Sequence, residues 1–136
     1  MNDCIFCKIV KGEIPCYKVW EDDNVLAFLD VAKDVDGHIL VIPKKHYNSI
    51  LDIDSKELTQ FIESVQQVCK YLVDKCGYSA VNILNASGKE AGQTVFHLHF
   101  HIIPRKINDG IDAFPHFEGA KQELNVIYNN IIGGNL

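Results

Sequence analysis

Residues 93–105 read Gln-Thr-Val-Phe-His-Leu-His-Phe-His-Ile-Ile-Pro-Arg. Three histidines, His97, His99 and His101, alternate in this stretch with apolar residues. Because successive side chains of a β-strand point to opposite faces, the alternation predicts a strand over residues 95–103 with all three imidazoles on one face. The apolar side chains between them would bury the other face: Phe96, Leu98, Phe100 and Ile102. Packing does not require three imidazoles on one face, so the pattern indicates a chemical role.

Imidazole chemistry alone leaves two interpretations of this trio open. Histidine is a common zinc ligand, and it is also a nucleophile or acid–base catalyst near neutral pH. The residues before the trio favour catalysis for at least one of the histidines. Gln93 and Thr94 carry neutral hydrogen-bond donors, and the loop containing Gly88 and Gly92 lets backbone N–H groups approach an anion.

The segments around this stretch follow an α+β order. A capping pattern at Asp54 and Glu57 and a glycine at Gly77 predict one long helix over residues 55–76. The other predicted elements are a short helix at 4–11, a hairpin at 17–21 and 25–29, strands at 39–42 and 80–84, and a last helix within 119–132. We therefore expect one domain over residues 1–136, with a mainly antiparallel five-stranded sheet, the long helix and the short N-terminal helix.

Composition narrows the possible partners. The chain has 136 residues, of which 47% are hydrophobic and 23% charged, as in a soluble globular protein. It has no apolar run long enough to span a membrane and no basic segment typical of a signal peptide, so a cytoplasmic location is expected. The net charge of −5 argues against binding to a nucleic-acid backbone.

Four ordered segments resemble the histidine triad (HIT) superfamily, in particular its bacterial nucleotide-binding branch. The likeness covers residues 4–9, 27–30, 37–46 and 92–105, while about the last thirty residues have no clear counterpart. The resemblance implies a hydrolase or transferase that cleaves the bond to the α-phosphate of a purine nucleotide conjugate. His99 would take the nucleotidyl group as a covalent phosphoramidate and then release AMP or GMP. The conjugate would be a phosphoramidate, an acyl-adenylate or a dinucleoside polyphosphate.

The same resemblance implies a role for each site residue. His38 and His101 would contact the phosphate and leaving group, and Asp30 would accept hydrogen bonds from the ribose hydroxyls. Phosphate oxygens would be held by Asn85, Gln93 and Thr94. The purine would be enclosed by Ile5, Phe6, Ile9, Phe28, Val31 and Leu40. In the alternative interpretation, Phe28 and Leu40 are ordinary core residues and Asp30 ends its strand in a turn.

Cys4 and Cys7 form a CxxC pair, which is a weak indication on its own. Together with His46 and His97 they make a Cys₂His₂ set, a normal ligand set for structural zinc. Zinc-bearing relatives place ligands at such positions, so the resemblance implies a bound zinc. The alternative is two reduced thiols and a histidine in a turn.

Two other functions and an assembly are also open at this stage. The pocket could bind and sense nucleotides with little turnover, or all three histidines could hold one catalytic metal. The resemblance further implies a two-fold homodimer in which the long helix and a sheet edge pair with their symmetry mates. The sequence supports a dimer through a wide apolar face on the long helix: Val65, Val68, Cys69, Leu72 and Val73.

Overall fold

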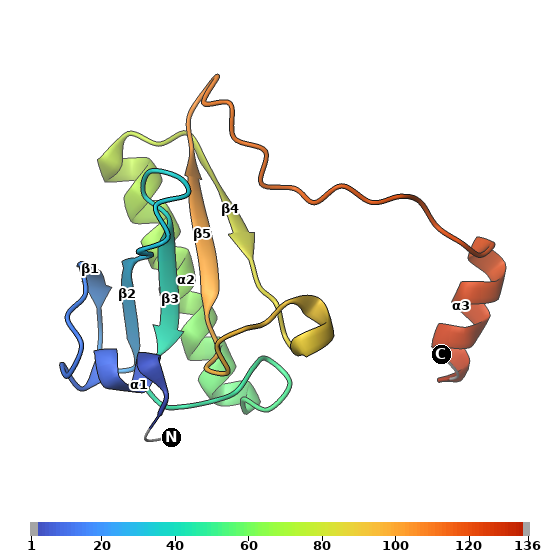
Figure 1. The fold of residues 1–136 in the computed structure, drawn as a ribbon, viewed down its shortest axis with the longest axis horizontal. Coiled ribbons are helices and arrows are strands. Elements are labelled where there is room, and N and C mark those ends of the chain that lie inside the picture. The colour runs from blue at the N-terminus through green and yellow to red at the C-terminus, as the bar shows by residue number, and fades with distance from the viewer. Residues whose placement is uncertain (1–2, 135–136) are drawn as a thin grey trace.

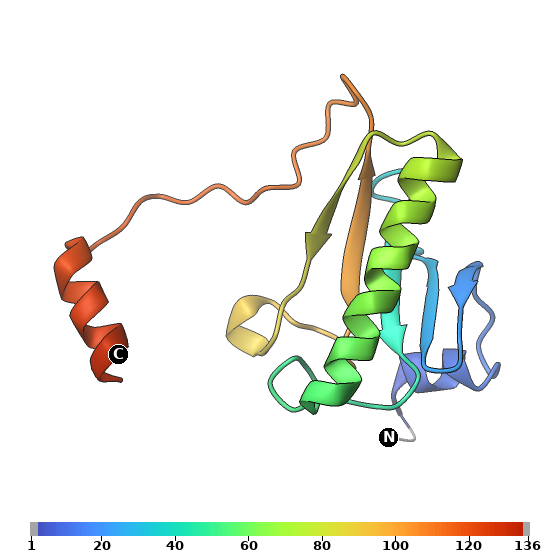
Figure 2. The same ribbon diagram turned by 180° about the vertical axis from the view of Figure 1, so that it is seen from behind.

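The computed structural model describes residues 3–134 and contains a five-stranded antiparallel sheet with the order β1-β2-β3-β5-β4. The strands are β1 (Lys18–Glu21), β2 (Val25–Leu29), β3 (Ile39–Pro43), β4 (Ala80–Leu84) and β5 (Phe100–Arg105). The helices are α1 (Ile5–Val10), α2 (Ser55–Cys76), the 3₁₀ turn η1 (Lys89–Ala91) and α3 (Leu124–Gly133). Figure 1 shows the sheet from the side of α1, and Figure 2 shows α2 lying across its other face. The predicted α+β class is confirmed.

Helix α2 has the predicted bounds, and its termini explain why. The Asp54 carboxylate accepts the Glu57 N–H at 2.8 Å, and Gly77 ends the helix in the left-handed conformation at φ 82°. The helix buries one stripe against the sheet: Phe61, Val65, Val68 and Leu72. Most of the apolar face that we expected to form a dimer contact is therefore covered within the chain itself.

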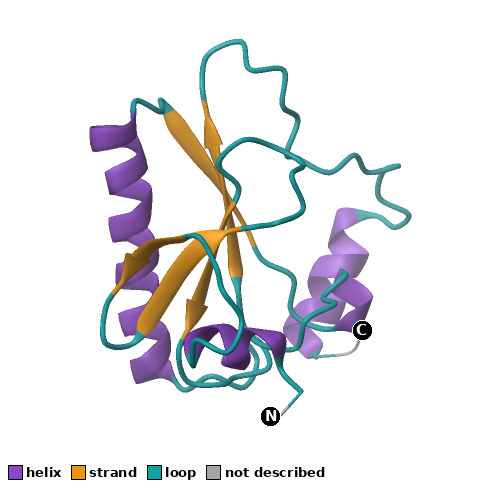
Figure 3. Cartoon of the chain, turned by 60° about the vertical axis from the view of Figure 1, so that its left-hand side comes forward, coloured by secondary structure: helices purple, strands orange, loops and turns teal. Residues whose placement is uncertain are grey.

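The sheet separates two apolar clusters. On the α2 side, the buried side chains include Ala27, Val41 and Ile102. On the other side, Phe6 of α1 packs with Leu26, Phe28, Leu40 and Ile42. Because α1 is short, it covers only the end of this second face at which β3 ends (Figure 3). The remainder of the face is available to the histidines.

Strand β5 begins at Phe100, five residues later than the sequence pattern predicts. Residues 95–99 approach it as an irregular segment, in which the Leu98 N–H donates to the Tyr47 carbonyl at 2.7 Å. His97 and His99 thus precede the strand, although Leu98 is still fully buried on the α2 side. The expected burial of Phe96 is wrong: its side chain is 49% exposed, because the chain has not yet entered the sheet.

After β5 the chain turns away from the sheet. Arg105 holds the turn by donating to the Asp109 carboxylate and the Ile111 carbonyl. An extended segment then leads to α3, which begins five residues later than Gly119, where the sequence suggested it, and stands apart from the sheet (Figure 1). No residue of α3 is buried within the described chain. None of the helices in residues 3–134 combines the length and apolarity needed to cross a membrane.

Candidate active site and metal centre

Four predicted ligands meet at the end of β3. Cys4 caps the start of α1 and Cys7 lies one turn later, while His46 follows β3 and His97 precedes β5. The Sγ atoms lie 3.3 to 3.6 Å from the facing Nδ1 atoms of these two histidines. A tetrahedral zinc would hold sulfur and nitrogen ligands about 3.6 Å apart. The four side chains therefore have the right composition and spacing for zinc, and we call them the metal group.

The far nitrogen of each histidine in this group already has a hydrogen-bond acceptor. His97 donates from Nε2 to the Pro43 carbonyl at 2.8 Å, and His46 faces the Asn48 amide oxygen at 3.2 Å. Each bond leaves Nδ1 with its lone pair toward the thiols, as metal-binding histidines normally are. Burial lowers the pKa of His97 to about 4, so its imidazole is neutral at physiological pH. A neutral, oriented imidazole is the form that binds zinc.

His99 lies two residues from His97 and is arranged differently. Its Nδ1 lies 2.7 Å from the His97 carbonyl oxygen. Since a carbonyl only accepts, Nδ1 carries the hydrogen, and in the neutral ring Nε2 keeps its lone pair. Phe6 packs edge-on against this ring with the ring centroids 5.2 Å apart. It packs in the same way against His97, with the ring centroids 5.8 Å apart. Phe6 of α1 therefore contacts both a histidine of the metal group, His97, and the next histidine of the sequence motif, His99.

His101 and His38 lie beside His99, and we call these three histidines the triad cluster. His101 lies opposite Leu40 in the register of β5 and β3, which brings it close to His38 just before β3. His38 Nε2 and His101 Nδ1 are 2.9 Å apart, and the rings of His99 and His101 are centred 5.1 Å apart. Burial, followed by the neighbouring imidazoles, lowers the pKa of His101.

Two aspartates face the His38 ring. The Asp34 carboxylate lies 2.8 Å from Nδ1, and an Asp30 oxygen lies 3.6 Å from Nε2. Asp30, His38 and His101 also lie close enough together to hold a metal ion. A hydrogen bond also joins the two histidines directly, through His38 Nε2 and His101 Nδ1. This arrangement can pass a proton between the two rings.

A cavity of about 420 Å³ opens beside His38 and His101. Asn85 lines it, and Asp34 reaches it from the loop before His38. Several lining residues were not predicted from the sequence: Asp34, Val35, Leu84, Ala86, Ile103, Ile111, Asp112 and Ala113. The register of β4 with β5, which pairs Leu84 with His101, could have indicated Leu84 and its neighbours. Ile111–Ala113 reach the cavity only because Arg105 turns the chain back there.

The three predicted phosphate-binding residues lie in different environments. The Asn85 amide donates to the His99 carbonyl at 3.0 Å, beside the cavity. Gln93 is buried, and its amide hydrogens go to the carbonyls of Asn48 and Val95. This side chain holds the loop together and has no donor left for a phosphate, contrary to our expectation. Thr94 is exposed and lines another recess, beside Cys4 and His46.

The predicted base-binding residues divide into two sets. Phe6, Phe28 and Leu40 are buried together, and Ile9 packs against them. Ile5 and Val31 instead have exposed side chains, 47% and 80% accessible. Packing thus gives Phe28 and Leu40 the core role that the sequence left open, whereas Ile5 and Val31 lie at the surface.

Gly37 fixes the approach to His38. It has φ +80°, and a Cβ atom there would lie 2.9 Å from the Tyr78 hydroxyl and 3.1 Å from Pro104 Cγ. The loop therefore packs directly against the strand ends behind it, which fixes the backbone next to His38.

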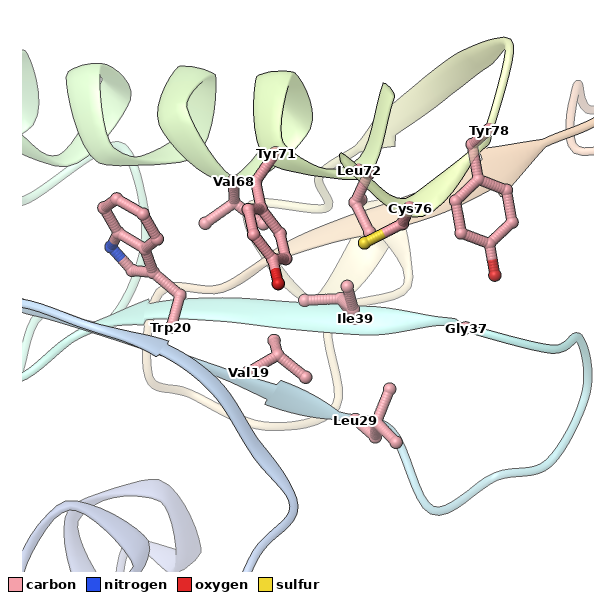
Figure 4. Close-up of a pocket in the computed structure, with 10 residues that line it drawn as sticks. All are labelled: Val19, Trp20, Leu29, Gly37, Ile39, Val68, Tyr71, Leu72, Cys76 and Tyr78. Carbon is pink, nitrogen blue, oxygen red and sulfur yellow. The ribbon is translucent and has the colours of Figure 1, made fainter. Parts of the chain in front are cut away.

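Another cavity, of about 250 Å³, lies on the α2 side of the sheet (Figure 4). Its lining includes Trp20, Ile39, Tyr71 and Cys76. Ile39 faces α2, so this cavity is separated by the sheet from the histidines. It is apolar and holds none of the predicted site residues.

The HIT domain model matches residues 11–108, which include the whole triad. An uncharacterized HIT-like protein of Borreliella burgdorferi is 49% identical over 132 residues, which covers 93% of this chain and 90% of the relative. The chain belongs to the HIT family.

Two further relatives carry more specific descriptions. An adenosine 5'-monophosphoramidase of Schizosaccharomyces pombe is 44% identical over 102 residues, covering 75% of this chain and 74% of the relative. The crystal structure of a Zn-bound histidine triad family protein from Mycobacterium smegmatis superposes with a TM-score of 0.77 at 33% identity. That match covers 85% of this chain and 84% of the other.

Proposed function

We propose that this protein hydrolyses purine nucleotide conjugates at the α-phosphate through a nucleotidyl intermediate on His99. The observation that carries the proposal is the hydrogen bond from His99 Nδ1 to the His97 carbonyl. It fixes the tautomer in which Nε2 is a nucleophile, beside His101 and the cavity. The phosphoramidase among the relatives supports the same class of reaction.

The reaction would proceed by two displacements at phosphorus. His99 Nε2 attacks, the leaving group departs with its electron pair and a proton, and water then cleaves the new phosphorus–nitrogen bond. The Asn85 amide holds the His99 carbonyl beside the cavity, and Asp30 is available for the ribose hydroxyls. The exposed Ile5 and Val31 would flank the base, with Phe6, Ile9, Phe28 and Leu40 forming the wall behind them.

The four-ligand group would hold a structural zinc ion. A closed set of four protein ligands leaves no open position for substrate, so the zinc would tie α1 to the sheet. Since α1 carries Phe6, the zinc would also keep Phe6 against the His99 ring. The zinc-bound relative supports this assignment.

A panel of AMP conjugates tests the proposed activity. We expect AMP release from conjugates with amine, acyl-phosphate or pyrophosphate leaving groups, measured by chromatography. Quenching in an alkaline denaturant, in which a phosphorus–nitrogen bond to imidazole survives, should trap one nucleotidyl group per chain, and peptide mapping at high pH should place it on His99. Tight AMP binding with no release from any conjugate would instead identify a nucleotide-binding module. One metal needed for turnover and held by all three histidines would identify a metalloenzyme.

We also propose that the protein forms a homodimer through its C-terminal arm, residues 106–134. The arm exposes large apolar side chains that a monomer leaves in water: Ile107, Phe114, Phe117, Leu124, Tyr128 and Ile132. Light scattering should give twice the 15.3 kDa chain mass, and a chain ending at residue 119 should dissociate more readily. A monomer mass for the full chain at micromolar concentration would contradict the proposal.

A further inference from the structure

A chain of hydrogen bonds runs from the surface to the ring of His101. Asp34 Oδ1 lies 2.8 Å from His38 Nδ1, and His38 Nε2 lies 2.9 Å from His101 Nδ1. His38 is 7% exposed, whereas the Asp34 side chain is about half exposed in the loop before β3. The sequence indicated no role for Asp34, yet it contacts the one nitrogen of His38 that faces away from the triad.

The positions of the hydrogens in this chain follow from what each group can do. A carboxylate only accepts, so His38 Nδ1 carries a hydrogen. A single hydrogen then lies between His38 Nε2 and His101 Nδ1. When the two rings are neutral, His101 donates this hydrogen, and its Nε2 is a bare lone pair. When the pair holds one additional proton, Nε2 of His101 carries a hydrogen.

We propose that Asp34 is a positioning residue that acts through His38 to determine whether His101 presents a proton or a lone pair to the substrate. This role rests on the proposed function. The carboxylate stabilises the protonated state of the His38–His101 pair, which makes the pair a proton store for both halves of the reaction.

Charges around the pair favour this role. His38 holds the pKa of Asp34 below its usual range, so the carboxylate is charged at neutral pH. The groups that face His101 are His99 on its own segment, His38 and Asp34 before β3, Asp30 after β2, and Asp112 from the arm across the cavity. Burial lowers the pKa of His101, and Asp34 contacts the pair only at the His38 ring, so the negative charge acts on the pair from the His38 side.

The proton balance closes over the two displacements. In the first, the leaving group takes the proton from His101 Nε2, and the hydrogen of His38 Nε2 moves to His101 Nδ1. In the second, the attacking water gives a proton to His101 Nε2, and the hydrogen on Nδ1 returns to His38. The phosphorus–nitrogen bond breaks with its electron pair returning to His99. The enzyme ends in its starting state.

Nitrogen-15 NMR of the histidines in the resting, metal-loaded protein tests the role of Asp34 without turnover. In D34N we expect the pair to accept its additional proton at a pH about one unit lower, because the neutral amide keeps the bond but loses the charge. D34E should recover most of this shift. D36N, which changes an exposed carboxylate of the same loop, should titrate like the wild type. The proposal is overturned if D34N titrates like D36N.

Kinetics with two AMP conjugates then separates positioning from general structural damage. An alkylamine must be protonated to leave, whereas a nitrophenolate leaves without help. For D34N at pH 7.5 we expect kcat for the amine conjugate to fall about tenfold and to recover toward pH 6, with less than about a twofold change for the nitrophenyl conjugate. Equal losses on both conjugates would overturn the proposal. If the wild type releases no AMP, the proposed function fails, while the NMR titration still decides the contact with Asp34.

Discussion

The metal group and the triad cluster contain the same side chain in opposite chemical situations. His97 and His99 are two residues apart and both donate to a backbone carbonyl. His97 uses Nε2 for this bond and is fully buried, with Nδ1 toward two thiols. His99 uses Nδ1, and Nε2 is left for chemistry. In the proposed function, the nitrogen that donates this hydrogen bond therefore decides which histidine serves as a ligand and which as a nucleophile.

Removing the free nitrogen, Nε2 of His99, should have the largest effect on activity. In H99A we expect kcat to fall by at least about four decades, because the covalent route disappears while the other contacts to nucleotide remain. Nucleotide affinity, measured by calorimetry, should change little. H116A is the control, since that ring is 90% exposed. Near-normal turnover by H99A would refute the nucleophile assignment.

The next largest effect should follow from opening the metal group. C4S and C7S should each lose the zinc, measured by elemental analysis, and Tm should fall by roughly 10 °C, on the order of 2–3 kcal/mol for a chain of this size. Some activity should persist because His99 is intact. C76S, which changes an exposed thiol, should keep both metal and Tm. Zinc retained in both ligand variants would show that the metal is bound elsewhere.

Removing the hydrogen-bond partner of the zinc ligand His46 separates an effect on zinc binding from an effect on catalysis. N48A deletes the amide oxygen that faces His46 Nε2, so we expect zinc affinity to fall by about 10–100-fold in a chelator competition. At saturating zinc, kcat should stay within about twofold of the wild type. If kcat falls while zinc affinity is unchanged, Asn48 belongs functionally to the catalytic cluster instead.

The smallest effect is expected from Asn85, which donates to the backbone of His99 in the triad cluster. N85A removes the donor to the His99 carbonyl and should lower kcat by about tenfold, with no change in zinc content. A loss of about 10²–10³ would show that the Asn85 amide binds the transition state directly. Unchanged kcat would remove Asn85 from the site.

Most of the fold could be predicted from the sequence because local patterns and tertiary packing agree. The bounds of α2 follow from the Asp54 cap and Gly77, and the Cys₂His₂ group follows from residue type and family resemblance. The start of β5 could not be predicted, because alternation continues through residues 95–99 even though they are outside the sheet. The pattern describes which side of the chain is apolar, and does not report strand pairing.

Site residues were harder to predict where a side chain has two possible uses. Gln93 is as good a donor for a phosphate as for a carbonyl, and only the folded loop shows that its amide is already bonded. Asp34 had no pattern around it, because the role proposed for it depends on the His38 ring, four residues away, which turns back toward it. The role of the arm could not be predicted either, because the exposed apolar residues of α3 pack against nothing within the described part of one chain.

Gly37 has a consequence for any saturation library of this protein. Selection would strongly favour glycine at position 37, and sequence statistics would then mark it as clearly as His99, although its place is set by its positive φ and by the Tyr78 hydroxyl and Pro104 behind the loop. Among G37A clones, survivors should be enriched for Y78F, which removes the atom that the new methyl group would meet. Paired enrichment of this kind would distinguish a steric requirement from a chemical one without a kinetic assay.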